Sequence, residues 1–525
     1  MCGIIAVLRR PSTREVPELV ELLGLLESVS NSLSVEDLKI LKKQVESLDF
    51  VNSQLKGLPG FLALLTNEGL IPAIETSLDR LFDFFQNPEV QPSLSSNDVE
   101  VLNVLSSRMR DLVWSIKNDR VGSYKRVSDL TSKKFPPSHQ GFSALLSLQQ
   151  ALSGLDRLEV RGRDSAGLQI LVWDHDLADF EIPEDRLNDL LFCSGSVRKS
   201  SNGSLLFVYK TASEIGDLGD NTNSLRQSIV SDDLLAKALS GKNVKANIVG
   251  HTRWASVGLI SESNAHPVEA SSTKQEVVTT VQNGDIDNYA DLIASYGLEI
   301  PKGITTDARV APELWQKNRI DGISSEESFI NTVRNFEGSV AIAGVDASHP
   351  ENIFLSVKGS GQALYVGLAE DAYLVASEPY GLVEMTNTYL RVDGEELIDD
   401  FSEKGQVIRL DMHLAGTVEG IARKTFASND AKVFEEDLSE TEISTRDIDR
   451  GSYKHYLLKE IEESPSSVRA TLRGRLIKGE NGEFDVRLGA ETFPDQLKRD
   501  LELEKITKVI VIGQGTAAVA ARAVA

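Results

Sequence analysis

The 525-residue sequence contains only two cysteines, Cys2 and Cys193, which lie far apart and form no C-x-x-C pair. This scarcity argues against a disulfide framework and a thiolate metal site, and it fits a reducing, cytoplasmic location. Basic residues are also scarce, because 55 Lys and Arg stand against 79 Asp and Glu. The net charge of −24 would repel nucleic acid and anionic membranes, so neither is an expected partner. No apolar run reaches the ~18 residues that span a bilayer.

The remaining composition, with 41% hydrophobic and 26% charged residues, is that of soluble globular domains. At ~100 to 200 residues per domain, the length leaves room for three or four folding units. Residues 2–8 form an apolar run typical of a strand that is buried on both faces. Helical spacing follows, with apolar stripes at 19–26, 38–48, 74–85 and 102–116. We therefore expect residues 9–140 to form an independent helical insertion whose ends lie close together.

Short β-type runs dominate from residue 166 onward, with helical stretches near 288–296 and 307–317, which predicts mixed sheets covered by helices. Residues 427–450 are rich in Asp, Glu, Ser and Thr, and this composition predicts an acidic linker over 431–450. The sequence KVIVIG at 508–513 predicts a strand, followed by a glycine-containing turn and the start of a helix.

Cys2 directly follows Met1, and such a small residue normally permits removal of the initiator methionine. The mature chain would then carry a thiol and an α-amino group on one residue. Because an α-amino group has a pKa near ~7.7 to 8.0, part of it is neutral at pH 7 and can act as a general base. The alternative is a cysteine that follows Met1 by chance. Cys193, in contrast, is most simply a small core residue.

Four segments resemble one family: LEVRGRDSAGL at 158–168, GHTRWASVGLISESNAHPVE at 250–269, VQNGDIDNYADL at 281–292 and TTDARV at 305–310. Together with Cys2 they resemble the class II glutamine amidotransferases, in which an N-terminal cysteine hydrolyses glutamine and ammonia passes to a second domain. The resemblance implies an α+β fold with a four-layer αββα N-terminal-nucleophile hydrolase domain, formed by residues 1–8 and 141–430.

The resemblance also implies roles for individual residues. Asn283 and Gly284 would form the oxyanion hole beside Cys2, because donors must already face the developing negative charge. Arg253 would clamp the α-carboxylate of glutamine, and Asp307 would accept from its ammonium group. Trp254, Ser256 and Arg161 complete the expected substrate site. The sequence departs from the family at Val257, where relatives usually carry His, so a polar contact near the substrate is missing.

Each of these residues also has an ordinary structural interpretation. Asn-Gly is the commonest tight-turn dipeptide, and isolated charges such as Arg253 and Asp307 are usually solvated. His251 and His266 lie inside matched motifs without metal-ligand spacing, so we interpret them as structural histidines. No metal and no cofactor is expected.

The C-terminal part resembles the sugar-phosphate aminotransferases within this class. Residues 451–476 are similar to their linker helices, and residues 508–523 are similar to the opening of a sugar isomerase domain, whose glycine-rich turn can hold a phosphate. Ala517 stands where relatives commonly have a hydroxyl residue. Because the chain stops at Ala525 within the first helix of that domain, we expect the front part of a longer protein.

Glutamine and fructose 6-phosphate are the implied substrates, and glucosamine 6-phosphate and glutamate are the implied products of the whole protein. The resemblance leaves a homo-oligomeric assembly open. Two alternatives also remain open: another class II amidotransferase, such as a phosphoribosyl or asparagine-forming enzyme, or a non-catalytic glutamine-binding regulatory module.

Overall fold

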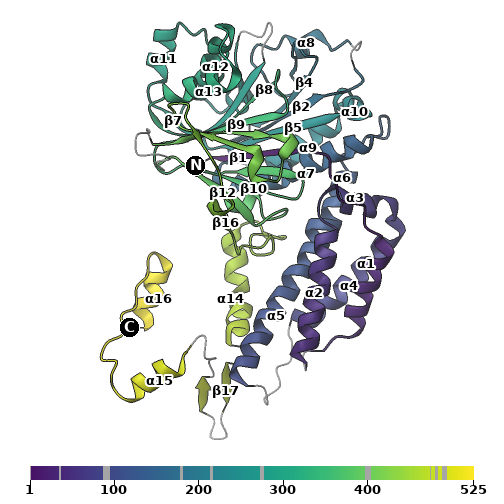
Figure 1. The fold of residues 1–525 in the computed structure, drawn as a ribbon, viewed down its shortest axis with the longest axis vertical. Helices are drawn as coiled ribbons and strands as arrows, with labels where there is room; N and C mark the ends of the chain where they lie inside the picture. Colours follow the sequence, from purple (N-terminus) through teal and green to yellow (C-terminus); the bar gives the residue numbers. More distant parts are fainter. Residues whose placement is uncertain are drawn as a thin grey trace.

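The computed structural model describes residues 2–34, 37–86, 95–177, 181–212, 217–271, 277–395, 404–472, 475–478, 483–486 and 493–524. Two antiparallel sheets lie face to face at the centre of the body and are covered by helices on their outer sides (Figure 1). This arrangement is the four-layer αββα fold, so the expected α+β class is confirmed.

Sheet A has nine strands among the described residues. In spatial order they are β16 (Leu438–Glu440), β12 (Thr388–Asp393), β10 (Ala363–Leu368), β11 (Ala372–Ala376), β1 (Gly3–Arg9), β5 (Lys245–Arg253), β2 (Ser165–Trp173), β4 (Leu205–Ala212) and β3 (Val197–Lys199). The N-terminal strand β1 therefore lies in the middle of the sheet, between β11 and β5.

Sheet B has seven strands within the described part of the chain. Their order is β15 (Asp430–Ala431), β14 (Ile421–Lys424), β13 (Gln406–Asp411), β9 (Asn352–Lys358), β8 (Gly338–Asp346), β7 (Val278–Ile286) and β6 (Val268–Glu269). Apart from β3, β6, β12, β14, β15 and β16, the strands of both sheets coincide with the β-type runs expected from the sequence.

Alternation along β1 explains why it is apolar from Gly3 to Leu8. Ile4, Ala6 and Leu8 belong to the core between the two sheets, whereas Ile5 and Val7 belong to the core beneath the helices outside sheet A. Because successive side chains of a strand point to opposite faces, a central strand of a four-layer fold must be apolar on both.

Helices cover the outer faces of both sheets. Sheet B is covered by α11 (Tyr289–Tyr296), α12 (Val310–Ile320) and α13 (Ser325–Arg334). Sheet A is covered by α7 (His139–Leu158), α9 (Asp220–Val230) and α10 (Asp233–Leu239), while the short α8 (Glu184–Leu187) lies against β3. The helix α7 is the central member of its layer and contacts both β1 and β5.

The helical segment between β1 and α7 projects from the body as a long arm (Figure 1). It contains α1 (Leu19–Asn31), α2 (Leu38–Gln54), α3 (Gly57–Thr66), α4 (Ile71–Gln86), α5 (Ser96–Trp114) and α6 (Gly122–Ser128), with a π-helical turn at Ser115–Val121. The strand before it and the helix after it are in contact, because Arg9 Nε donates to Ser147 Oγ of α7 at 3.1 Å.

The segment is not packed as a separate unit, which an independent insertion would be. Its apolar residues form one continuous core with those outside sheet A, and the rings of Phe61 and Phe142 lie 5.5 Å apart across the junction. The buried guanidinium of Arg120 also donates to the carbonyl oxygen of Glu384 at 2.9 Å. The arm is therefore packed as an extension of the α7 layer and not as a separate unit.

Residues 427–450 are more than a solvated connection. They include β15 and the edge strand β16, and the hydroxyl of buried Thr445 donates to Asp119 at 2.6 Å. Beyond them lie α14 (Tyr456–Leu472), the hairpin of β17 (Leu476–Lys478) and β18 (Phe484–Val486), α15 (Asp495–Glu502) and α16 (Thr516–Val524).

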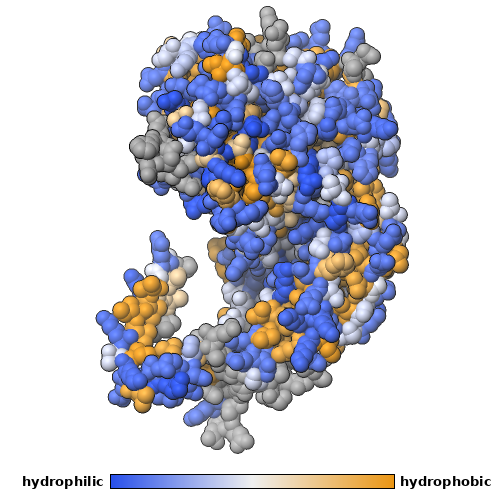
Figure 2. Space-filling model, viewed as in Figure 1, coloured by the Kyte–Doolittle hydropathy of each residue, from blue (hydrophilic) through white to orange (hydrophobic). Residues whose placement is uncertain are grey.

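The expected strand at 508–513 is absent from the described structure. These residues form no strand, and Ile512 is 87% exposed. Among the described residues no strand lies beside them to pair with their backbone groups, and an unpaired apolar run has no reason to become a strand. Figure 2 shows apolar side chains on the surface of this C-terminal segment.

No single helix among the described residues is both long and apolar enough to cross a membrane. One bent pair, Gly57–Thr66 with Glu68–Phe85, passes that test of length and composition when its two helices, 85° apart, are taken together.

Candidate active site

Cys2 lies at the start of β1, and the alternation of that strand directs its side chain toward the space between the sheets, as for Ile4. The backbone N–H of Trp254 donates to Cys2 Sγ at 3.3 Å, and Cys2 Sγ lies 3.5 Å from the Trp254 carbonyl oxygen. A Cβ on Gly3 would lie 2.7 Å from both Leu158 Cβ and Thr252 Oγ1, so glycine is required there. The backbone next to Cys2 is therefore closely packed.

Burial raises the pKa of the Cys2 thiol, while the hydrogen bond from Trp254 and the charge of Arg253 act in the opposite direction. The thiol is consequently protonated at neutral pH, and a base is needed to remove its proton during an attack.

Arg253 ends β5 and points to the same side of sheet A as Cys2, since Gly3 pairs with Thr252. Its guanidinium is buried and donates to the carbonyl oxygens of Val257 and Leu259, the latter at 3.2 Å. The backbone of the loop that follows Trp254 therefore takes up hydrogen bonds of this guanidinium. Val257, the position of the family departure, contributes its backbone oxygen to the contact.

Asn283 and Gly284 lie on β7 of sheet B, across the inter-sheet space from Cys2. The Oδ1 atom of buried Asn283 is 3.1 Å from His251 Nε2. Burial, together with the charge of Arg253, lowers the pKa of His251 to about 3, so the ring is neutral and Nε2 must carry the proton that Asn283 accepts. This contact leaves the Asn283 amide nitrogen free to donate elsewhere.

Gly284 has a left-handed backbone, with φ of +80°. A Cβ there would lie 1.9 Å from the carbonyl oxygen of Ser339, so no other residue fits. The Asn-Gly pair therefore lies within strand β7, paired with β8, and the tight-turn interpretation does not apply.

Asp307 begins a short 3-10 helix and is buried. It accepts from the Ile286 backbone N–H at 2.9 Å and from Gln282 Nε2 at 3.1 Å. Burial raises the pKa of its carboxyl group. Arg253 and Asp307 are near enough to influence each other electrostatically, and neither is the solvated surface charge of the ordinary interpretation.

The other three expected substrate residues have different surroundings. Trp254 is 50% exposed, and its backbone contacts Cys2. Ser256 donates to Asp285 Oδ1 at 2.5 Å. Arg161 forms an ion pair with Glu378, which follows β11 next to Ser377, the residue whose hydroxyl accepts from the backbone of Ile4. Arg161 therefore lies near the start of β1, and its guanidinium is already paired with Glu378.

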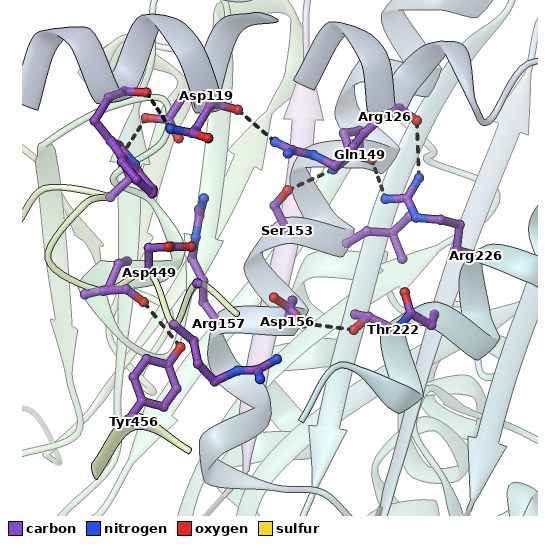
Figure 3. A pocket seen from close by; sticks show the side chains of 18 residues that line it. Asp119, Arg126, Gln149, Ser153, Asp156, Arg157, Thr222, Arg226, Asp449 and Tyr456 are labelled. Carbon is purple, nitrogen blue, oxygen red and sulfur yellow. Dashed lines mark hydrogen bonds between the residues drawn. The ribbon is translucent and has the colours of Figure 1, made fainter. Parts of the chain in front are cut away.

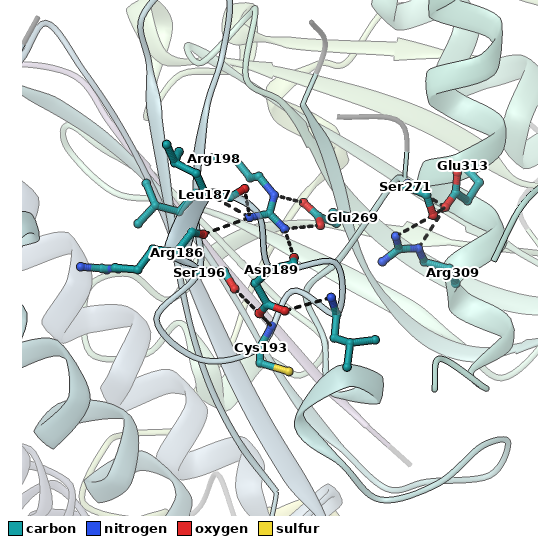
Figure 4. Close-up of polar contacts among 12 residues, drawn as sticks. Arg186, Leu187, Asp189, Cys193, Ser196, Arg198, Glu269, Ser271, Arg309 and Glu313 are labelled. Carbon is teal, nitrogen blue, oxygen red and sulfur yellow. Dashed lines mark hydrogen bonds and ion pairs between the residues drawn. The ribbon is translucent and has the colours of Figure 1, made fainter. Parts of the chain in front are cut away.

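Cys193 is a free thiol in the loop before β3 (Figure 4). It is half-buried, and its backbone N–H donates to Asp189 Oδ2 at 2.7 Å. It is thus a loop residue and not the small core residue expected from the sequence. Burial raises the pKa of this thiol too.

Several residues that hold the site were not singled out from the sequence. Asn264 Oδ1 accepts from the backbone N–H groups of Thr305 and Thr306 at 2.7 and 3.1 Å, and Asp164 accepts from that of Ala255 at 2.8 Å. Their signal was present, because each lies inside or beside a matched motif. Among the described residues, no group of three His, Cys, Asp or Glu side chains could hold a metal ion.

Two facing antiparallel sheets between helical layers, with a cysteine opening the central strand, define the fold of N-terminal-nucleophile hydrolases. The surrounding motifs make the chain similar to the class II glutamine amidotransferases within that fold.

Particular relatives sharpen this similarity. The chain is 29% identical over 336 residues to a protein named glutamine–fructose-6-phosphate aminotransferase [isomerizing] from Geobacillus kaustophilus, covering 64% of this chain and 44% of that relative. A relative of the same name from Bacillus licheniformis is 28% identical, with 64% of this chain and 44% of the relative covered. Another from Shouchella clausii is 29% identical, with 61% of this chain and 41% of the relative covered. The chain thus spans less than half the length of these curated relatives.

No family model matches the chain. Among solved structures, a glutamine phosphoribosylpyrophosphate amidotransferase from B. subtilis is 18% identical with a TM-score of 0.35, covering 54% of this chain and 48% of its own. A score this low carries no argument.

Proposed function

We propose that Cys2 hydrolyses glutamine and that the ammonia released is passed to an acceptor bound by another part of the protein. One observation carries the proposal: Cys2, Arg253 and Asn283 reach one end of the inter-sheet space from three strands of two sheets. The buried charges of Arg253 and Asp307 match the carboxylate and ammonium groups of a free amino acid.

The reaction follows from these positions. After removal of Met1, the α-amino group of Cys2 takes the thiol proton, and Sγ attacks the side-chain carbonyl carbon of glutamine. The Asn283 amide and the Gly284 N–H donate to the resulting oxyanion. The α-ammonium group of Cys2 then gives the proton to the amide nitrogen, the C–N bond breaks, and ammonia leaves. Water hydrolyses the thioester to glutamate and restores the thiol.

The test is glutamate release from glutamine by the purified chain. Cys2→Ala should lower the rate by several orders of magnitude, because loss of a nucleophile leaves only residual catalysis. An electrophilic glutamine analogue should add to Cys2 with Met1 absent. Cys193→Ala is the matched control and should keep full activity and labelling. Full activity in Cys2→Ala would refute the proposal.

For the acceptor we propose a sugar phosphate, with fructose 6-phosphate aminated to glucosamine 6-phosphate by a longer protein of which this chain is the front part. The names of the relatives support this choice. In this division, residues 1–8 and 141–430 form the amidotransferase domain and 451–525 begin the sugar isomerase domain. A different class II amidotransferase would release glutamate but aminate another acceptor, and a regulatory module would bind glutamine without releasing glutamate.

A further inference from the structure

A second cavity, separate from the Cys2 site, lies where the helical arm, the α7 layer and the segment after β16 meet (Figure 3). Its volume is about 310 Å³, enough for a small phosphorylated metabolite. The arm contributes the end of α5 and α6, the outer layer contributes α7 and α9, and the third wall is formed by residues 445–456.

Four arginines line this cavity: Arg126, Arg157, Arg226 and Arg450. Arg126 donates to the Asn118 carbonyl oxygen at 3.1 Å and to Ser123 Oγ at 2.9 Å. Arg226 donates to the Arg126 carbonyl oxygen at 3.2 Å and to Gln149 Oε1 (Figure 3).

Arg450 donates to the Leu218 carbonyl oxygen at 3.0 Å and to that of Tyr453. Within the described ranges, Arg126, Arg226 and Arg450 are thus bonded to neutral oxygens and form no ion pair. Arg157 pairs with Glu384 through Nη2 at 2.7 Å, whereas its buried Nη1 has no hydrogen-bond partner. The cavity therefore contains guanidinium charge that no carboxylate neutralises at contact distance.

The electrostatics of Arg226 show the consequence. Burial and, next, the charge of Arg126 lower the pKa of Arg226, and this outweighs the opposite influence of Asp129 and Asp156. The two guanidinium groups are therefore near enough to repel each other. A bound anion would relieve this repulsion, because it interacts favourably with both groups.

The acidic residues of the lining do not fill that role. Asp119 already accepts from the hydroxyls of Ser115 at 2.9 Å and Thr445 at 2.6 Å. Asp156 is exposed to solvent and accepts from Thr222 at 3.2 Å. Burial raises the pKa of Asp449, so its carboxylate is held at a cost in solvation, and it forms no ion pair with the arginines of the lining among the described residues.

We propose that this cavity binds a small organic phosphate. The guanidinium groups would hold the phosphate, since their planar donors match its oxygens. The hydroxyl and amide groups of Ser153, Thr222 and Asn223, which also line the cavity, suit a hydroxylated organic part. Because the ligand would contact three separate parts of the chain at once, its binding also stabilises their arrangement.

The first test is isothermal titration of the full chain with inorganic phosphate, glucose 6-phosphate and glucose, in chloride buffer of constant ionic strength. We expect glucose 6-phosphate to bind more tightly than inorganic phosphate and glucose not to bind. Equal binding of the two phosphates would indicate a free-phosphate site instead of an organic-phosphate site. Absence of binding by both would overturn the proposal.

Two substitutions of lining residues locate the site. Asn223→Asp adds a negative charge at an exposed position and should weaken glucose 6-phosphate at least tenfold. Asp449→Asn removes a negative charge and should tighten glucose 6-phosphate binding severalfold. A folding defect would not produce such a gain. Arg108→Met, which breaks an exposed ion pair with Asp49 on the same arm, is the control and should leave the affinity unchanged. Unchanged affinity in both lining variants would place any bound phosphate elsewhere.

Discussion

Strand β1 and residues 508–513 are both short, apolar and rich in β-branched residues, yet they have opposite environments. Every residue of β1 is buried, with hydrogen bonds to β11 on one side and β5 on the other. Residues 508–513 are exposed and form no strand within the described structure. An apolar run thus specifies a strand only where neighbours supply hydrogen bonds and covering layers. The body and the C-terminal segment should therefore respond very differently to the same kinds of change.

The largest effect should follow replacement of residues 11–138 by a short Gly/Ser linker. This change removes the arm and exposes the α7 surface around Phe142, which packs on the same continuous core. Because that apolar area returns to water, we expect insoluble protein or loss of cooperative thermal unfolding. A soluble product that unfolds cooperatively and hydrolyses glutamine would show that the arm is independent after all.

Substitution of the buried charges should have the next largest effect. Arg253→Ala and Asp307→Ala should each raise the glutamine KM more than a hundredfold, because a buried pair that loses one partner typically costs ~3–5 kcal/mol. Steady-state kinetics measure this change. Lys505→Ala in the C-terminal segment, which breaks an exposed ion pair with Asp500, is the contrast and should change nothing measurable. Normal KM values in both body variants would place these charges outside the glutamine site.

His251 offers a test of positioning within the body. His251→Ala releases Asn283 Oδ1, so the amide loses its fixed direction. We expect kcat to fall ~10²–10³-fold, the usual effect of losing one oxyanion donor, with little change in KM. His251→Gln can still donate to Oδ1 and should recover part of the rate. A rise in KM alone would point to a binding defect instead.

A smaller, pH-dependent effect is expected at Lys210 on β4, which is 3% exposed and whose Nζ has no hydrogen-bond partner. Burial lowers its pKa to about 7, whereas the unfolded chain keeps the ordinary value of 10.5. Between these values the unfolded state binds more protons, so this residue makes stability rise with pH by at most ~1.4 kcal/mol per unit.

In Lys210→Met this contribution should disappear, and the mutant should be relatively more stable at pH 6 than at pH 9. Urea unfolding at several pH values measures the difference. Lys245→Met, at a partly exposed ion pair with Asp174 in the same sheet, is the control. A parallel pH profile for Lys210→Met and the parent would mean that the buried amine keeps its ordinary pKa.

The smallest effect should come from removal of residues 505–525. The described part of this stretch is mostly exposed, so its loss should leave the unfolding temperature and glutamine hydrolysis unchanged. A drop of several degrees would reveal contacts with the body that are important for stability.

Much of the fold could be predicted because the patterns were strong. The run at 2–8 predicted a doubly buried strand, and the stripe at 38–48 predicted α2. The merging of the arm with the α7 layer could not be predicted, because helical periodicity shows which face is buried but not against what. The strand prediction for residues 508–513 failed for the opposite reason. Their pattern was clear, but no described strand lies beside them to pair with.

The sequence predicted which residues make up the candidate site but not the contacts between them. The motifs singled out Arg253 and Asn283, but their spacing could not reveal that a loop occupies the first or that His251 orients the second. Such contacts join segments far apart in the chain and depend on how the two sheets face each other. The role of Asn264 in holding the 305–306 backbone was hidden for the same reason.

The contact between Arg253 and the loop carbonyls has a consequence for substrate affinity. Under the proposed role of Arg253, the backbone of Val257 and Leu259 is a tethered competitor for the guanidinium that the α-carboxylate of glutamine must reach. A tethered competitor is always present, so the apparent affinity is reduced by the fraction of molecules in which the loop holds the arginine. Substitutions that weaken only the contact between the loop carbonyls and Arg253 would therefore lower the glutamine concentration at which the site is half filled. They would do so without altering any group that touches the substrate.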